Sequence, residues 1–224
     1  MARMFSAEEF HRTGSLLISD AFRAEDRRIA SGAFCDAAGM RQNSMPEHLV
    51  QWLCNHRGLN GLAETLCANP CRLVRIIAFD KSPHSNWFVP WHQDRTIAVR
   101  EEAEVEGYAH WTFKDGLHHA EPPIEVLESM VTLRLHIDDC GPDSGPLEVI
   151  DGTHVCGRLD KAQISEIVSS TPSRVLLAAE SDVIAMRPLL LHRSKRSSGA
   201  RRRRVLHLEY SFADLPAPLS WALN

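Results

Sequence analysis

The sequence predicts a mainly β fold in which helices pack outside a barrel-like or two-sheet core. Helix formers with apolar residues at mixed spacings of three and four dominate the first third of the chain. From residue 72 onward, seven or so segments have the composition of β-strands. Turn-forming stretches such as KSPHSN, DDCGPDSG and SKRSSGA separate several of these segments. Strands that follow a helical start favour a closed or two-layer β core with external helices.

The individual elements follow from the same patterns. A capping-box spacing of Ser6 and Glu9 indicates the start of a helix. Further helices are expected over 22–38, 46–68, 121–129 and 160–169. Strands are expected over 72–79, 89–99, 130–138, 146–150, 174–179, 182–192 and 203–212. Because no repeat or low-complexity linker interrupts the chain, we expect a single domain over 1–224. Its helical part reaches to about residue 70, and its β core spans about 72–212.

Composition narrows the classes of function. The 224 residues are 44% hydrophobic and 24% charged, which is typical of a globular protein with a full-sized core. No apolar run reaches membrane-spanning length, and the first residues lack a secretory pattern, so we expect a cytoplasmic protein with no membrane partner. The net charge of −4 argues against a nucleic-acid partner. The basic stretch RSKRSSGARRRR at 193–204 is a local exception.

Cysteine usage and standard motifs exclude several chemistries. Six cysteines are scattered, and Cys67 and Cys71 have no second pair to complete a zinc site. We interpret all six as reduced thiols that mostly serve packing. The Walker motif, G-x-G-x-x-G, H-E-x-x-H and G-x-S-x-G are all missing from the sequence, which argues against those enzyme classes.

Two His-x-Asp pairs are the first candidates for chemistry. They are His92 with Asp94 and His136 with Asp138, each within an apolar strand-like run. On a strand, residues two apart share a face, and burying them without a partner is costly. A chain with 12 histidines contains such pairs by chance, so each pair alone is weak evidence for a site.

Metal chemistry offers a stricter test of these pairs. Two ligands at i and i+2 and one distant histidine can occupy one face of an octahedral Fe(II), as the two-histidine, one-carboxylate triad. His192, at the end of the apolar run MRPLLLH, is the candidate for the distant ligand. The alternative for His192 is a hydrogen-bonded core histidine.

The next strand carries a candidate for binding an anion. Alternation places Arg203 and His207 on one face of RRVLHLEY and Arg204 on the other. An arginine that enters a barrel interior needs an anion, and a dicarboxylate cosubstrate could supply one. Ser194 could add a hydroxyl donor. The alternative is a solvated basic turn or a nucleic-acid patch, which we favour for Arg201 and Arg202.

Three segments together resemble the phytanoyl-CoA dioxygenase family of Fe(II)/2-oxoglutarate-dependent oxygenases. FDKSPHSNWFVPWHQD resembles the segment that delivers the His-x-Asp ligands. LRLHIDDCGPDSGPLEVIDGTH resembles the family's strand-turn-strand, with Ser144 for the usual Asn and Thr153 for the usual Ser. LLLHRSKRSSGARRRRVLHLEY resembles the closing segment. The resemblance spans roughly 72–212 and implies a double-stranded β-helix, or jelly-roll, core.

The resemblance also implies roles for individual residues. His92, Asp94 and His192 would be the iron ligands, and Arg203 and Ser194 would bind 2-oxoglutarate. Arg203 aligns better with the family's arginine than Arg204 does. His136 and Asp138 fall in the following strand, where Thr132 and Arg134 share their face and line the site. Arg134 would contact either the cosubstrate or the substrate, unless it is a structural ion-pair partner.

The function expected from this reading is hydroxylation of an unidentified small molecule. Related halogenating oxygenases lack the carboxylate ligand, and this chain keeps Asp94, which favours hydroxylation. The expected cofactors are Fe(II), 2-oxoglutarate as cosubstrate, and O2, with succinate and CO2 as coproducts. One alternative is desaturation or another oxidation at the same iron centre. Another is a nucleic-acid-binding β domain that uses residues 193–204, although no aromatic stacking pattern accompanies those basic residues.

Overall fold

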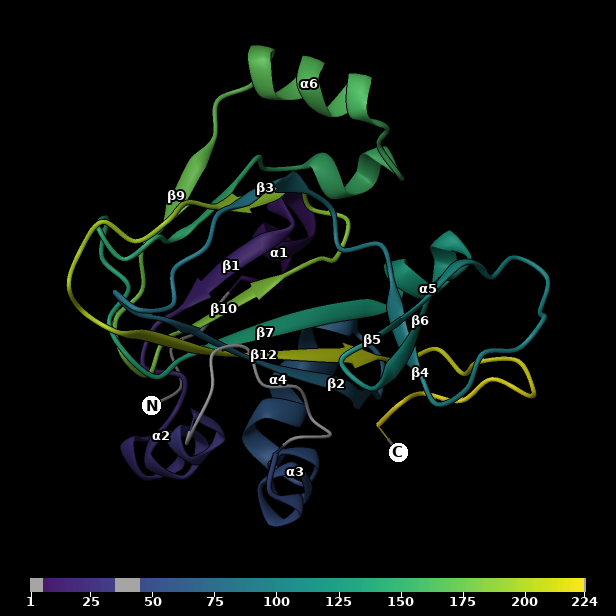
Figure 1. Ribbon diagram of the computed structural model, residues 1–224, viewed down its shortest axis with the longest axis horizontal. Coiled ribbons are helices and arrows are strands. Elements are labelled where there is room, and N and C mark those ends of the chain that lie inside the picture. Colours follow the sequence, from purple (N-terminus) through teal and green to yellow (C-terminus); the bar gives the residue numbers. More distant parts are fainter. Residues whose placement is uncertain (1–5, 35–44, 224) are drawn as a thin grey trace.

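Antiparallel sheets dominate the computed structural model, which describes residues 6–34 and 45–223. A five-stranded sheet has the order β1 (Ser15–Ile18), β10 (Val183–Met186), β7 (Met130–His136), β12 (Arg203–Ser211) and β2 (Arg72–Lys81). A four-stranded sheet has the order β3 (Val89–His92), β11 (His192–Ser194), β8 (Leu147–Val149) and β9 (Arg174–Leu176). A smaller sheet contains β4 (Ile97–Val99), β6 (Leu117–Glu121) and β5 (Ala109–Lys114) (Figure 1).

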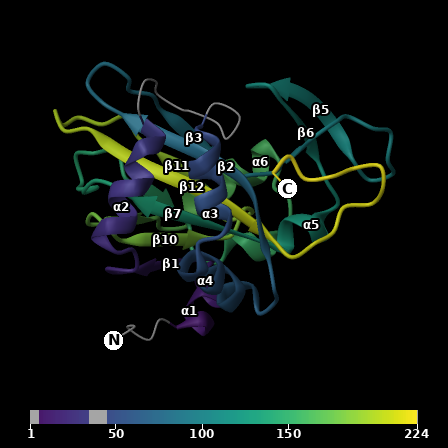
Figure 2. The ribbon, with the colours of Figure 1, turned by 90° about the horizontal axis from the view of Figure 1, so that it is seen from below.

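Helices lie mainly on the side of the five-stranded sheet that faces away from the four-stranded sheet. Seen from below, the early helices cross in front of the long strands (Figure 2). They are α1 (Ala7–Thr13), α2 (Ala24–Ala30), the 3-10 turn η1 (Ser31–Phe34), α3 (Glu47–Cys54) and α4 (Arg57–Cys67). Later helical segments are α5 (Ile124–Glu128), the 3-10 turn η3 (Thr153–Cys156) and α6 (Lys161–Ser170). No helix of the described residues is long and apolar enough to cross a membrane.

The two faces of the five-stranded sheet differ sharply in polarity. On the helix side, Leu133 and Leu135 of β7 pack with Leu206 and Leu208 of β12 in the main core cluster, all fully buried. The opposite face of the same strands carries Arg134 and other polar side chains, and these are buried too. Because buried polar groups are costly unless they are paired, the polar face marks where the fold serves function rather than stability.

Several expected elements differ from the structure. The segment expected as one helix over 46–68 is two helices, α3 and α4, which are separated at Asn55 and His56. The helical first third contains the strand β1, which pairs with β10 at the sheet edge. The expected strand 89–99 divides into β3 and β4, and the expected strand 182–192 divides into β10 and β11. The hairpin of β5 and β6 has no counterpart among the expected strands.

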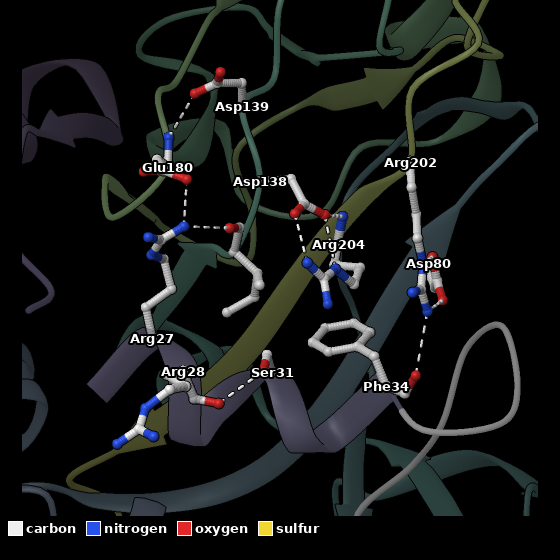
Figure 3. Close-up of polar contacts among 11 residues, drawn as sticks. Arg27, Arg28, Ser31, Phe34, Asp80, Asp138, Asp139, Glu180, Arg202 and Arg204 are labelled. Atoms are coloured by element: carbon white, nitrogen blue, oxygen red, sulfur yellow. Dashed lines mark hydrogen bonds and ion pairs between the residues drawn. The ribbon is translucent and has the colours of Figure 1, made fainter. Parts of the chain in front are cut away.

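Two arginines of the basic stretch, Arg202 and Arg204, are neutralised by Asp80 of β2 and by Asp138, which follows β7 (Figure 3). Arg204 forms a two-pronged ion pair with Asp138, at 2.6 and 2.8 Å, and its guanidinium lies over the Phe34 ring. Arg202 pairs in the same way with Asp80 and also donates to the Phe34 carbonyl oxygen. Arg202 is exposed, as expected, but it also has an ion-pair partner that the sequence did not indicate. These contacts anchor the end of η1 on the sheet.

Candidate active site

A cluster of two histidines and one carboxylate lies at the edge of the four-stranded sheet. β3 and β11 run antiparallel, with His92 opposite His192, so residues 100 positions apart in the chain meet. One ligand atom from each of His92, Asp94 and His192 lies within 4.8 Å of the others. Among the described residues this is the only group of three or more such side chains that could hold a metal ion. His136 and Asp138 belong to no such group.

Asp94 reaches the cluster because the strand ends. The expected strand continues through Asp94, but β3 stops at His92. The intervening Gln93 is buried and turned away, and its amide makes three hydrogen bonds to backbone atoms of Gly157, Leu159 and Leu189. The backbone N–H of Asp94 donates to the Pro188 carbonyl oxygen at 2.9 Å. Gln93 therefore fixes the segment that aims Asp94, a role that the sequence analysis missed.

Backbone carbonyls orient both imidazoles. Nδ1 of His92 lies 2.9 Å from the Pro90 carbonyl oxygen, and Nδ1 of His192 lies 2.8 Å from that of Leu190. A carbonyl oxygen can only accept, so each Nδ1 carries the proton and each Nε2 is left as a lone-pair donor. The two Nε2 atoms lie 3.4 and 3.7 Å from the Asp94 carboxylate oxygens. Metal-binding histidines are typically oriented in this way, so the donor set fits a divalent metal such as Fe(II).

The protonation states of His192 and Asp94 agree with ligand chemistry. Burial lowers the pKa of His192 to about 4, so this imidazole is neutral near pH 7. Burial acts to raise the pKa of Asp94, but the adjacent imidazoles of His192 and His92 outweigh it and hold that pKa below its ordinary value. Asp94 is therefore ionised. A neutral imidazole and an ionised carboxylate are the forms that coordinate metals.

Next to the cluster is a cavity with an excess of positive charge. Three cations line it together with Asp94, namely Lys81, Arg134 and Arg203. None of the three forms an ion pair with a carboxylate of the described residues; their hydrogen bonds go to hydroxyl, carbonyl and imidazole groups. Arg193 also lines the cavity, but Glu148 neutralises it through two hydrogen bonds of 2.8 Å. Buried cations without carboxylate partners favour an anionic ligand.

Arg203 points inward as strand alternation predicts. Its exposed fraction is 3%, and its guanidinium donates to the carbonyl oxygens of Ser144 and Gly145 at 3.4 and 3.2 Å. The Ser194 hydroxyl donates to the same Gly145 oxygen at 2.9 Å, which holds both predicted residues on one side of the cavity. Gly145 has φ +64°, and a side chain there would collide with the Lys195 carbonyl oxygen at 2.5 Å. Glycine is therefore required where this turn approaches the cavity.

Lys81 is a site residue that the sequence analysis missed. It lies directly opposite Arg203 in the pairing of β2 with β12. Its exposed fraction is only 1%, and its Nζ donates to the Ser194 hydroxyl at 2.9 Å. Burial and the charges of Arg203 and Arg134 lower the pKa of Lys81 to about 7. Because the expected strand ended at residue 79, its alternation was not followed to Lys81.

The other predicted residues of β7 divide into two groups. Arg134 lines the cavity, whereas Thr132 is buried on the same face but does not line it. His136 is buried, and neither ring nitrogen has a hydrogen-bond partner among the described residues. Burial lowers the pKa of His136 to about 3, so it is a neutral core residue. Asp138, which follows β7, is the ion-pair partner of Arg204.

The hairpin of β5 and β6 contributes a further buried histidine. His119 has an exposed fraction of 4%, and its Nε2 lies 3.1 Å from Nη2 of Arg75. Arg75 in turn pairs with Glu209 at 3.2 Å. In the sequence, a short hairpin of polar residues could not be told from a polar loop.

Comparisons with known proteins agree with the geometry. L-proline trans-4-hydroxylase of Streptomyces griseoviridis is 25% identical over 179 residues, which cover 68% of this chain and 59% of that protein. The chain thus matches about three-fifths of that relative's length.

Two solved structures share the fold at 15% identity each. The carbocyclase SnoK from nogalamycin biosynthesis, described as non-heme and alpha-ketoglutarate-dependent, has a TM-score of 0.71 over 96% of this chain and 84% of SnoK. HygX from Streptomyces hygroscopicus, with nickel and 2-oxoglutarate bound, has a TM-score of 0.64 over 93% of this chain and 87% of HygX.

The family of this chain follows from a family model that matches most of its length. The model of the family described as phytanoyl-CoA dioxygenase (PhyH) matches residues 4–205 of the 224. That match includes the two histidines and the carboxylate of the cluster as well as Lys81, Ser194 and Arg203. The chain therefore belongs to the phytanoyl-CoA dioxygenase family, whose members depend on Fe(II) and 2-oxoglutarate.

Proposed function

We propose that this protein is an Fe(II)/2-oxoglutarate-dependent dioxygenase that hydroxylates a small molecule. The observation that carries the proposal is the meeting, in one cavity, of the metal-ligand cluster with cations that have no carboxylate partner. Hydroxylation is favoured because Asp94 occupies the carboxylate position and because the curated relative is described as a hydroxylase. We also assign the two-sheet core over about 72–212 to the double-stranded β-helix class, in one domain with the N-terminal helices.

Each residue of the cavity has a defined task in this proposal. His92, Asp94 and His192 would hold Fe(II), and Arg203, Ser194 and Lys81 would hold the far carboxylate of 2-oxoglutarate. When bound, iron, 2-oxoglutarate and O2 supply the oxidising power that breaks a substrate C–H bond and release succinate and CO2. The protein orients the ligands through the carbonyl oxygens of Pro90 and Leu190.

A different oxidative outcome is the second candidate. The similar structure SnoK is described as a carbocyclase, so an alternative for this chain is desaturation or ring formation at the same centre. Product analysis by mass spectrometry separates the outcomes, since hydroxylation adds one oxygen atom and desaturation removes two hydrogen atoms.

Binding of the two cofactors tests the proposal directly. Under anaerobic conditions, Fe(II) and 2-oxoglutarate together should produce a weak visible charge-transfer band, because a three-residue face leaves adjacent positions for chelation. Neither component should produce the band alone. A protein that binds 2-oxoglutarate equally well without any divalent metal would contradict the proposal.

The buried lysine makes cosubstrate binding depend on pH. Near pH 7, Lys81 of the free protein is partly neutral. In the complex, the far carboxylate of 2-oxoglutarate favours the charged form of Lys81. As the pH rises above about 7, binding must therefore draw in a proton, and the affinity should fall by up to about tenfold per pH unit. Titrations of the iron-loaded protein between about pH 6 and 8.5 measure this slope, and Lys81→Met should flatten it. An equal slope in that variant would assign the effect to another group.

A further inference from the structure

Arg134 is the cation of the cavity that the proposed cofactors leave without a partner. It projects from β7, its exposed fraction is 8%, and its guanidinium carbon lies 5.5 Å from the centre of the Phe79 ring. Its Nη1 lies 2.9 Å from Nδ1 of His207, and its other terminal nitrogen, Nη2, forms no hydrogen bond within the described residues. Burial lowers the pKa of Arg134 only to about 10, so the group stays charged at neutral pH.

A buried polar chain holds Arg134 in this orientation. A guanidinium only donates, so Nδ1 of His207 accepts and its Nε2 carries the proton. That Nε2 lies 3.3 Å from the Glu209 carboxylate, which also pairs with Arg75 at 3.2 Å. Glu209 is thus already satisfied by two donors and does not neutralise Arg134. The polar chain fixes the position of the guanidinium but leaves its charge unbalanced.

The charges of the proposed complex leave Arg134 without a negative partner. In the proposed complex, Asp94 and one carboxylate of 2-oxoglutarate balance the two charges of Fe(II). The far carboxylate faces both Arg203 and Lys81, so it leaves no negative charge for Arg134. Arg134 pairs across the sheet with His207, four residues from Arg203 on β12, or about 13 Å along the strand. A buried charge without a partner is strongly unfavourable, so a further anion is required near Arg134.

We propose that the substrate of this protein carries a carboxylate, and that Arg134 binds it. The inference rests on the proposed function, since the charge count includes the iron and 2-oxoglutarate of that function. A carboxylate matches the planar donor pattern of a guanidinium better than a spherical anion does. His207 and Glu209 act as positioning residues, because they hold Arg134 without contacting the ligand themselves.

A pair of isosteric probes tests the proposal without knowledge of the substrate. The anaerobic protein is saturated with Fe(II) and 2-oxoglutarate, and propanoate or its uncharged counterpart propanamide is titrated while the visible band is recorded. We expect propanoate at millimolar concentration to shift the band, and propanamide to require at least about tenfold more. A loss of the band, rather than a shift, would indicate displacement of 2-oxoglutarate and would count against the proposal.

Variants separate the possible roles of Arg134. Arg134→Gln should weaken propanoate binding at least about tenfold while the affinities for iron and 2-oxoglutarate change less than about threefold. Arg134→Lys keeps the charge and should retain part of the propanoate response. Arg201→Gln, which removes one charge from a side chain that is 68% exposed, is the matched control and should behave as the wild type.

Three results would overturn the inference. They are a loss of 2-oxoglutarate affinity of about 30-fold or more in Arg134→Gln, equal binding of propanamide and propanoate, and no response of the wild type to propanoate. The first result would show that Arg134 serves the cosubstrate. A wild-type protein that forms no band with Fe(II) and 2-oxoglutarate would instead contradict the proposed function itself.

Discussion

Arg203→Ala should bind 2-oxoglutarate about 30-fold to several thousand-fold more weakly than the wild type and still bind iron. The Arg203 side chain is almost fully buried on one side of the cavity, and its hydrogen-bond partners among the described residues are carbonyl oxygens only. Removing one partner of a desolvated charge pair costs about 2–5 kcal/mol, because the other charge stays buried and unpaired. At tenfold per 1.4 kcal/mol, this cost corresponds to the expected loss of affinity. Titration of the iron-loaded protein with 2-oxoglutarate measures it.

Arg204→Ala is the matched control on the same strand. Its side chain lies on the opposite face, where it pairs with Asp138, so its loss should affect stability and leave the cosubstrate affinity nearly unchanged. Arg203→Lys guards against a folding defect, since it keeps a donor near the Gly145 carbonyl oxygen. If 2-oxoglutarate binds normally to Arg203→Ala, the anion is held elsewhere, and Lys81 and Arg134 become the next candidates.

His192→Ala should lose iron, whereas His136→Ala should retain it. His192 presents an Nε2 lone pair 3.7 Å from the Asp94 carboxylate, and its Nδ1 is fixed by the Leu190 carbonyl. Loss of an outer-shell partner typically lowers metal affinity by roughly 10–100-fold. Deleting a ligand itself should lower the affinity for iron by more than that. Metal analysis after anaerobic loading and desalting measures the iron content of both variants.

His136 is a suitable control because it is buried like His192 and, like His92, precedes an aspartate by two residues. It belongs to no metal-ligand group of the described residues, so its replacement leaves a cavity and removes no ligand. Iron that is lost from His136→Ala but kept by His192→Ala would reverse the assignment of the two pairs. Circular dichroism of both variants distinguishes loss of the metal from loss of the fold.

Much of the fold could be predicted because strand and helix patterns differ in period. The strands β2, β7, β8, β9 and β12 fall within expected strands or overlap them closely, and α6 lies within one residue of its expected range. The prediction failed where a buried apolar run lies in a loop and not in a strand. In the run 182–192, Leu189 to Leu191 are buried in the connection between β10 and β11, and an apolar run has the same composition in a buried loop as in a strand.

Within the site, the sequence by itself determined the types of the chemical groups and the faces of the strands. Alternation placed Arg203 and His207 inward and Arg204 outward, and the order of three motifs indicated the family that the match over residues 4–205 confirms. These features are local, since they depend only on neighbouring residues and on the two-residue period of a strand.

Only the tertiary structure decided which distant groups meet. The pairing of β3 with β11 brings His92 to His192, and the pairing of β2 with β12 brings Lys81 to Arg203. The end of β3 at His92, together with the hydrogen bonds of Gln93, turns Asp94 toward both imidazoles. The polar chain behind Arg134 likewise joins three strands. Register between strands far apart in the chain depends on packing of the whole core, and no pattern within one segment encodes it.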